Sequence, residues 1–113
     1  MELSQMQRIV DEWMSQFEAG YWPPLANLAR LTEEVGELSR EINHRHGPKT
    51  KKASEAAGSI EGELGDILFT VVTLANSMNI DLDQVARDVL QKVVDRDSTR
   101  WKRRDTSSSE DGG

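Results

Sequence analysis

The sequence predicts an all-α protein, a four-helix bundle or part of one, from three observations. Apolar residues recur at helical spacing in four segments, no segment alternates apolar and polar residues as a strand would, and the length of 113 residues suits one domain with a single core. We place this domain at residues 1–104. Residues 105–113 are Ser, Asp, Glu, Gly and Thr with nothing to bury, so a disordered polar tail is expected there.

The first two helices are predicted from their apolar spacing and their end signals. The first is expected to begin at Ser4, a candidate N-cap, and to end at Gly20. The second should open at Pro23 and Pro24, because the missing N–H of proline costs nothing in the first turn of a helix. Residues 44–54 contain Gly, Pro and three Lys without apolar periodicity, which predicts a mobile basic loop.

The third helix is expected to run from Ser54 or Ser59 to Met78. Its apolar arc is broad enough to predict burial on more than one side, and together with the modest core of one chain it predicts self-association. Three glycines share one face and predict close helix packing, unless the helix starts late, at about Glu61. These glycines are Gly58, Gly62 and Gly65.

The fourth helix is predicted from a stop signal followed by a start signal. Asn79 is a plausible C-terminal stop, and Asp81 with Gln84 forms a capping-box pattern that opens the next helix. This helix is expected to reach about Arg103. Its apolar face continues in register as three cations, which indicate either an anion-binding wall or basic side chains that extend past the end of the bundle. These cations are Lys92, Arg96 and Arg100.

Composition excludes several functional classes. A net charge of −6 and a pI of about 4.9 argue against broad binding to nucleic acid or to an anionic membrane. The chain has no Cys, so disulfides and thiolate zinc sites are excluded, and a metal site must use oxygen atoms or the two histidines. No apolar run approaches the roughly 18 residues of a membrane span, and the N-terminus lacks a signal-peptide pattern. A cytoplasmic protein is expected.

Carboxylates border the apolar stripe on two of the predicted helices. Glu34 and Glu37 lie on one edge of the second helix, and Glu63 and Asp66 lie on a matching edge of the third. If these helices pack antiparallel, the four carboxylates converge and repel one another, and a divalent cation relieves that repulsion. An all-oxygen cluster suits Mg²⁺ or Mn²⁺. A solvated acidic face is the alternative reading.

These residues also form a composite motif that resembles a known family. Together the two carboxylate segments resemble the EExxE…ExxD signature of MazG-like nucleotide pyrophosphohydrolases, and the resemblance covers about residues 1–103. The two segments are Glu33-Glu34-Val35-Gly36-Glu37 and Glu63-Leu64-Gly65-Asp66. The resemblance implies a homodimer or homotetramer that uses Mg²⁺ to hydrolyse nucleoside triphosphates to monophosphate and pyrophosphate, with dNTPs or non-standard nucleotides as house-cleaning substrates.

The resemblance also assigns roles to individual residues. It implies that Glu34, Glu37, Glu63 and Asp66 hold the metal, and that Glu33 orients or deprotonates the attacking water. The substrate contacts it implies are Lys92 and Arg96 on the triphosphate, with Arg100 one turn further on. Ser59 stands where multi-domain members often carry a basic residue. A base pocket is also required, and helical spacing offers three aromatic candidates, for which ordinary core packing is the alternative: Trp13, Phe17 and Trp22.

Three alternatives remain open at this point. The first is an activity like that of phosphoribosyl-ATP pyrophosphohydrolase, which also needs a metal-bound triphosphate site. The second is a non-catalytic helical oligomerisation module with an acidic surface. The third is a carboxylate-bridged di-iron protein, for which Glu41 and His44 supply one Glu-x-x-His pair while the required second pair is missing.

Overall fold

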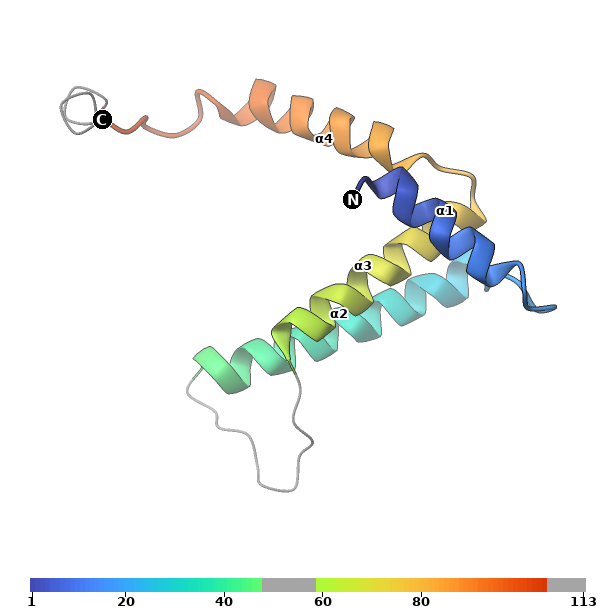
Figure 1. Cartoon of the computed structure of the whole chain (residues 1–113). Coiled ribbons are helices and arrows are strands. Elements are labelled where there is room, and N and C mark those ends of the chain that lie inside the picture. The colour runs from blue at the N-terminus through green and yellow to red at the C-terminus, as the bar shows by residue number, and fades with distance from the viewer. Residues whose placement is uncertain (48–58, 106–113) are drawn as a thin grey trace. The chain divides into compact units, whose positions relative to one another are not determined.

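The computed structural model describes residues 1–47 and 59–105, and this part of the chain is helical without strands (Figure 1). The all-α prediction is confirmed. The chain divides into two compact units, residues 1–82 and the residues from Asp83 onward. The helices are α1 (Leu3–Met14), α2 (Pro24–His46), α3 (Ile60–Ser77) and α4 (Leu82–Asp97).

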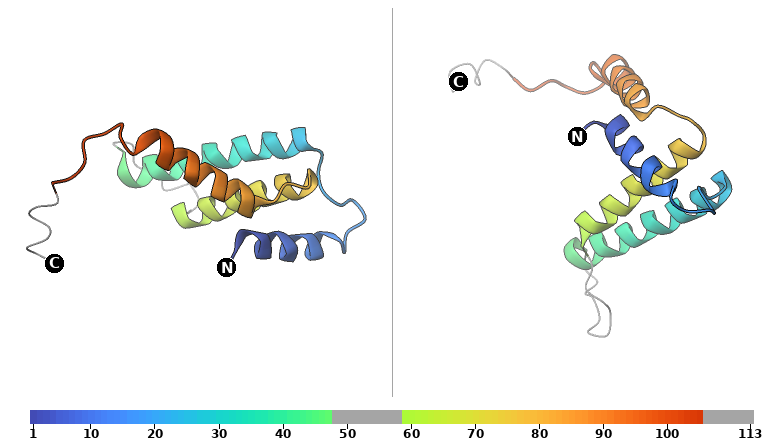
Figure 2. Two further views of the ribbon diagram at one scale, coloured as in Figure 1. Left: turned by 90° about the horizontal axis from the view of Figure 1, so that it is seen from above. Right: turned by 45° about the vertical axis from the view of Figure 1, so that its right-hand side comes forward.

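Helices α2 and α3 form the longest contact of the first unit. They lie side by side and run in opposite directions, while α1 packs across α3 (Figures 1 and 2). The antiparallel arrangement expected from the sequence is therefore present. It places the acidic edge of α2 opposite that of α3.

The core of the first unit is small and lies where α1 meets α3. Its buried apolar side chains are Val10, Val72, Ala75 and Leu82. Thr70 and Thr73 are buried beside them, and their hydroxyls donate to the carbonyl oxygens of Asp66 and Thr70, both at 2.8 Å. Because each hydroxyl proton has an acceptor, these polar residues fit the interior of the helix pair.

Much of the apolar surface on α2 and α3 is not covered within one chain. The side chains of Leu28, Leu64 and Leu68 remain 51%, 52% and 42% exposed. Helix α3 packs against both α2 and α1, so its predicted burial on more than one side is confirmed, while part of its apolar arc stays exposed in the single chain. Close packing at the glycines is not found, since a Cβ at Gly65 would meet no atom within 4 Å and one at Gly62 would meet the Ser59 side chain. Gly58 lies outside the described residues.

The ends of α1 differ from the prediction. The helix starts at Leu3 with Glu2 as the N-cap residue, so Ser4 is not the cap, and it ends at Met14 rather than at Gly20. A series of turns follows, and Gly20 closes it in the left-handed region with φ of +64°. Glycine adopts this conformation without steric cost.

Helix α2 begins as predicted and continues further than predicted. Pro24 occupies the first turn. At the other end, the Gly47 N–H donates to the Asn43 carbonyl at 3.0 Å, so residues 44–46 are helical rather than part of a loop. The remainder of the expected basic loop, residues 48–58, lies outside the part of the chain that the structure describes.

Helix α3 has well-defined ends. Of the two predicted starts, the structure uses Ser59, whose Oγ accepts the Gly62 N–H at 2.8 Å. Asn79 has φ of +57°, and the Ile80 N–H donates back to the Ala75 carbonyl at 2.9 Å. This is the geometry of a Schellman motif, which satisfies the last carbonyl groups of a helix. The predicted stop at Asn79 is confirmed.

Helix α4 begins next to the predicted cap and ends early. It starts at Leu82, directly after Asp81, and the Gln84 side chain bonds to Asp88 and Arg87 at 2.8 and 2.9 Å. The helix ends at Asp97, so the predicted extension to Arg103 is wrong. Most of the expected disordered tail, residues 106–113, lies outside the described residues.

A hydrogen-bond network joins α1 to the end of α3. The Gln7 amide donates to Asn76 Oδ1 at 2.9 Å and to the Ile80 carbonyl at 2.7 Å, and its oxygen accepts the Leu82 N–H at 3.0 Å. Asn76 in turn donates to the Gln7 carbonyl at 3.0 Å and to the Tyr21 hydroxyl at 2.9 Å. This network fixes the end of α3 against α1.

Candidate functional site

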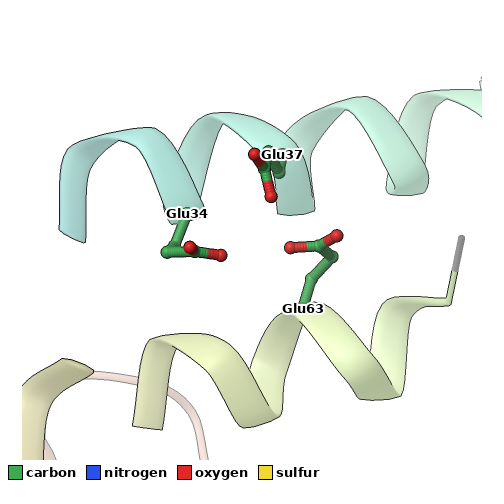
Figure 3. A group of neighbouring side chains, drawn as sticks. All are labelled: Glu34, Glu37 and Glu63. Carbon is green, nitrogen blue, oxygen red and sulfur yellow. The ribbon is translucent and has the colours of Figure 1, made fainter. Parts of the chain in front are cut away.

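Three carboxylates converge between α2 and α3. Glu34 and Glu37 extend from α2, and Glu63 extends from α3 toward them (Figure 3). One carboxylate oxygen from each of the three lies within 4.8 Å of the others. Within residues 1–47 and 59–105, this is the single group of three or more acidic or histidine side chains close enough to share a metal ion.

Two of these carboxylates have buried oxygen atoms without a hydrogen-bond donor among the described residues. These atoms are Glu34 Oε2 and Glu63 Oε2. The Glu34 side chain is 12% exposed, and its other oxygen, Oε1, lies 3.8 Å from Arg30 Nε. Buried carboxylate oxygens normally accept hydrogen bonds or bind a cation. The oxygens of Glu34 and Glu63 therefore fit an oxygen-ligated metal ion.

The surroundings raise the pKa of both buried carboxyl groups. For Glu34 the main cause is desolvation by burial, followed by the charges of Glu37 and Asp66. The pKa of Glu63 is raised first by burial and then by the charge of Glu37 and a hydrogen bond to it. Each group would lose its proton more readily beside a cation.

Asp66 and Glu33 lie next to the trio but outside it. Asp66 is exposed on α3, and its charge raises the pKa of Glu34 and of Glu63, which places it in their neighbourhood. Glu33 also raises the pKa of Glu34, and it lines an open hollow with Glu34, Arg30 and Trp22. Of the four predicted metal ligands, the structure thus brings three into one cluster and places the fourth at its border.

Arg30 was missed by the sequence analysis and lies beside the trio. Its guanidinium is near Glu34 and lies over the Trp22 ring, 5.5 Å from the ring centroid. The signal that could have found it is its position four residues before Glu34, where an i,i+4 ion pair is expected on a helix. Arg30 provides positive charge at the border between the carboxylates and the aromatic residues.

An aromatic cavity of about 260 Å³ adjoins Arg30. Of the three aromatic candidates, Trp13 and Trp22 line it, whereas Phe17 packs on Trp13 with their rings 5.0 Å apart. Trp13 is half exposed and also contacts Phe69 edge to face. The other residues on the wall are Met14, Tyr21, Asn27, Arg30, Phe69, Thr70 and Thr73.

The three predicted substrate cations belong to the second unit. Lys92 and Arg96 are exposed on α4, while Arg100 lies beyond the end of that helix and stacks on Trp101 at 5.0 Å. Arg96 binds Asp97 through two hydrogen bonds of 2.9 and 3.0 Å, and Arg100 approaches the same carboxylate at 3.6 Å. The contact of these cations with the substrate stays a prediction from the sequence.

A protein-family model matches most of this chain, including the carboxylate trio. The family model of the MazG nucleotide pyrophosphohydrolase domain matches residues 23–101. The chain belongs to the MazG family. The match includes the whole of α2, α3 and α4, and therefore every member of the carboxylate trio.

Two individual relatives match most of this MazG chain. YpjD of Bacillus subtilis (strain 168) is 50% identical over 103 residues, which is 91% of this chain and 93% of YpjD. YvdC of the same strain is 29% identical over 96 residues, or 76% of this chain and 91% of YvdC.

Two crystal structures show the same MazG-type fold. A Bacillus-conserved MazG protein, described as a nucleotide pyrophosphohydrolase, is 46% identical with a TM-score of 0.73, and the match covers 86% of this chain and 94% of that one. The structure of YpjD from Bacillus subtilis, assigned there as a candidate pyrophosphatase, also has a TM-score of 0.73 at 50% identity, over 81% of this chain and 94% of that one.

Membership of the MazG family makes this chain a nucleotide pyrophosphohydrolase. The family is metal-dependent, and the carboxylate trio is a suitable donor set. His44, which the di-iron alternative would need, is not part of this cluster in the described residues. Across residues 1–47 and 59–105, no helix combines the length and apolar character needed to span a bilayer.

Proposed function

We propose that this chain hydrolyses a nucleoside triphosphate, either a dNTP or a non-standard nucleotide, to the monophosphate and pyrophosphate with Mg²⁺ as the metal and Mn²⁺ as a substitute. The observation that supports this most directly is the trio of carboxylates within 4.8 Å, two of which have buried oxygens without donors. Such a set carries too much negative charge to receive a triphosphate unless a cation binds between them.

We assign the metal to Glu34, Glu37 and Glu63, with Asp66 completing the set from the border of the cluster. When bound, Mg²⁺ supplies charge neutralisation at the phosphates and activation of the attacking water. Glu33 is proposed to orient that water or accept its proton. It lies one residue from Glu34 and lines the same hollow, where its carboxylate is exposed.

The substrate side of the site is proposed to combine an aromatic cavity with cations. Trp13 and Trp22 line the cavity and offer ring faces for the base. Arg30, between that cavity and Glu34, is suited to a phosphate because a guanidinium donates two parallel hydrogen bonds to an oxyanion. Lys92 and Arg96 remain predicted triphosphate contacts from the sequence motif, with Arg100 contributing less.

The active form is proposed to be a homodimer or homotetramer. Several large apolar side chains on α2 and α3 are about half exposed in one chain, among them Leu28, Val35, Leu64 and Leu68. A second copy that covers them would gain roughly 25 cal/mol for every Å² of apolar surface buried.

A pyrophosphate-release screen tests this function. The wild-type chain is incubated with canonical dNTPs, dUTP, oxidised nucleotides and phosphoribosyl-ATP, each with Mg²⁺, with Mn²⁺ and with a chelator. We expect metal-dependent release from at least one triphosphate, lost in Glu37→Gln and kept in Glu12→Gln, a matched change at an exposed glutamate on α1. Turnover of phosphoribosyl-ATP alone would favour the alternative substrate, and no turnover of any nucleotide would contradict the proposal.

A further inference from the structure

The wall of the aromatic cavity contains one polar group whose hydrogen-bonding capacity is unused. Asn27, on α2, is 4% exposed and lines the cavity with Trp13 and Trp22. Its amide nitrogen, Nδ2, is buried and has no acceptor among the described residues. Buried amide groups in folded proteins nearly always have a partner, so a nitrogen left without one next to a cavity indicates a missing acceptor.

The other polar groups that line this cavity do not pair with that nitrogen. Thr70 and Thr73 are buried and line the same cavity, and their hydroxyl protons are already donated to the carbonyls of Asp66 and Thr70. Each hydroxyl keeps lone pairs but has no proton left to offer. The residues that line the cavity thus include Asn27 with its unpaired amide on α2, Thr70 and Thr73 with their hydroxyl lone pairs on α3, and two tryptophans.

This arrangement matches the edge of a nucleobase. A base is a flat aromatic ring that stacks on an indole and carries acceptors next to N–H donors along its edge. Apolar aromatic molecules of the same size also fit the walls, but they leave the Asn27 nitrogen unpaired. A site built around such a group rejects the analogue that lacks the hydrogen-bonding atom.

We propose that Asn27 is a specificity residue that donates a hydrogen bond from Nδ2 to an acceptor on the edge of the substrate's base. The inference rests on the proposed function, because it assigns the base of the nucleotide to the Trp13–Trp22 cavity. It adds that the cavity selects a base by an acceptor atom on the base edge and not by the shape of the ring alone.

Binding of unphosphorylated nucleosides tests Asn27 without any contribution from the metal or the phosphates. The probes are the four natural deoxynucleosides and two apolar isosteres, the difluorotoluene analogue of thymidine and a methylbenzimidazole analogue of the purines. Quenching of tryptophan fluorescence reports on the cavity, since Trp13 and Trp22 line it. The proteins are wild type, Asn27→Leu, Asn27→Asp and a control at an exposed position on the same helix, Asn43→Leu.

We expect wild type to bind at least one natural nucleoside about 10- to 100-fold more tightly than its apolar isostere. Asn27→Leu should weaken binding of the natural nucleoside and leave binding of the isostere unchanged, so that their dissociation constants differ by less than about threefold. Asn27→Asp keeps the shape but replaces the donor by an acceptor, and it should lose the same discrimination. Asn43→Leu should behave as wild type. Thermal melts of each variant confirm that it is folded.

The inference is overturned if Asn27→Leu weakens binding of the natural nucleoside and of its isostere equally, or if it weakens binding of neither. It is also overturned if no natural nucleoside binds in preference to its isostere. Either result leaves the pyrophosphate-release screen unaffected, so failure of the base-reading role is distinguishable from failure of the proposed function.

Discussion

Removing one charge from the carboxylate trio should stabilise the metal-free protein. Glu37→Gln keeps the shape of the side chain while removing its charge. The carboxylate oxygens of Glu34 and Glu37 lie within 4.8 Å of each other. Two unit charges at that separation repel by about 0.9 kcal/mol even with the full dielectric screening of water. Metal-free Glu37→Gln should therefore melt about 3–6 °C above metal-free wild type, given the size of this domain.

The same substitution should have the opposite effect when metal is present. A metal ion at 100 times its dissociation constant stabilises the folded state by about 2.7 kcal/mol, which raises the melting temperature by roughly 10 °C. Glu37→Gln replaces a charged ligand by a neutral one and should lose most of that increase. Wild type and variant thus exchange order when Mg²⁺ or Mn²⁺ is added.

Thermal melts with chelator and with each metal measure both effects, and pyrophosphate release measures turnover in the same samples. Glu12→Gln, an exposed change on α1, controls for the general effect of removing one negative charge. If metal-free Glu37→Gln melts below wild type, or if it keeps the full metal-dependent increase, then the trio is not the metal site. Turnover within a few-fold of wild type would refute the assignment as well.

Three further predictions follow from the remaining features. The pKa of Glu34 and of Glu63 is raised above the ordinary 4.5, so the folded state binds these protons more tightly than the unfolded state. The metal-free protein should therefore become more stable as the pH falls from neutral toward 4.5, whereas the metal-saturated protein should become less stable because protons compete with the metal. Thermal melts across this pH range measure both effects. Lys92→Ala and Arg96→Ala should each lower kcat/KM by about 10² with little change in metal affinity, and Arg100→Ala should cost less. If all three substitutions lower the melting temperature instead and spare the rate, these residues only stabilise the helix end. Light scattering at micromolar protein should show a dimer or tetramer, and a monomer would contradict the oligomer.

The convergence of the acidic residues could be predicted because it depends on geometry that a helix fixes. Residues three apart project from nearly the same face, so Glu34 and Glu37 had to share an edge once α2 formed. Gly47 and Pro48 in the sequence predicted an end to α2, which made an antiparallel pair with α3 the simplest packing and brought Glu63 across from Glu34 and Glu37. Asp66 lies outside the trio although it follows Glu63 at the same spacing as Glu37 follows Glu34, so helical spacing alone did not predict its place at the border.

The ends of the helices were predicted less well, because tertiary contacts override local capping patterns. Gln7 follows Ser4 by three residues, as in a capping box, yet its side chain bonds to Asn76, Ile80 and Leu82, which are distant in sequence. A local motif cannot reveal a partner some seventy residues away. Among residues 1–47 and 59–105, no contact with a residue distant in sequence explains the early end of α4.

Arg30 and Asn27 escaped the sequence analysis for a related reason. Each lies on α2, and neither residue type is distinctive on a helix. Their significance depends on the cavity, which is formed by side chains from α1, α2 and α3 together. For Arg30, the partial signal in the sequence was its i,i+4 spacing to Glu34. For Asn27, it was the position of a polar residue directly before the apolar Leu28.

The charge balance of the site explains why a metal, an arginine and the cations of the second unit are all invoked for one substrate. The trio contributes three negative charges in a chain whose net charge is already −6, and a nucleoside triphosphate is itself a polyanion. Arg30 offsets one of those charges through Glu34 and is partly engaged by it. A divalent ion between the carboxylates removes most of the remaining excess. Additional cations then act on the substrate rather than on the protein, which is the role predicted for Lys92 and Arg96.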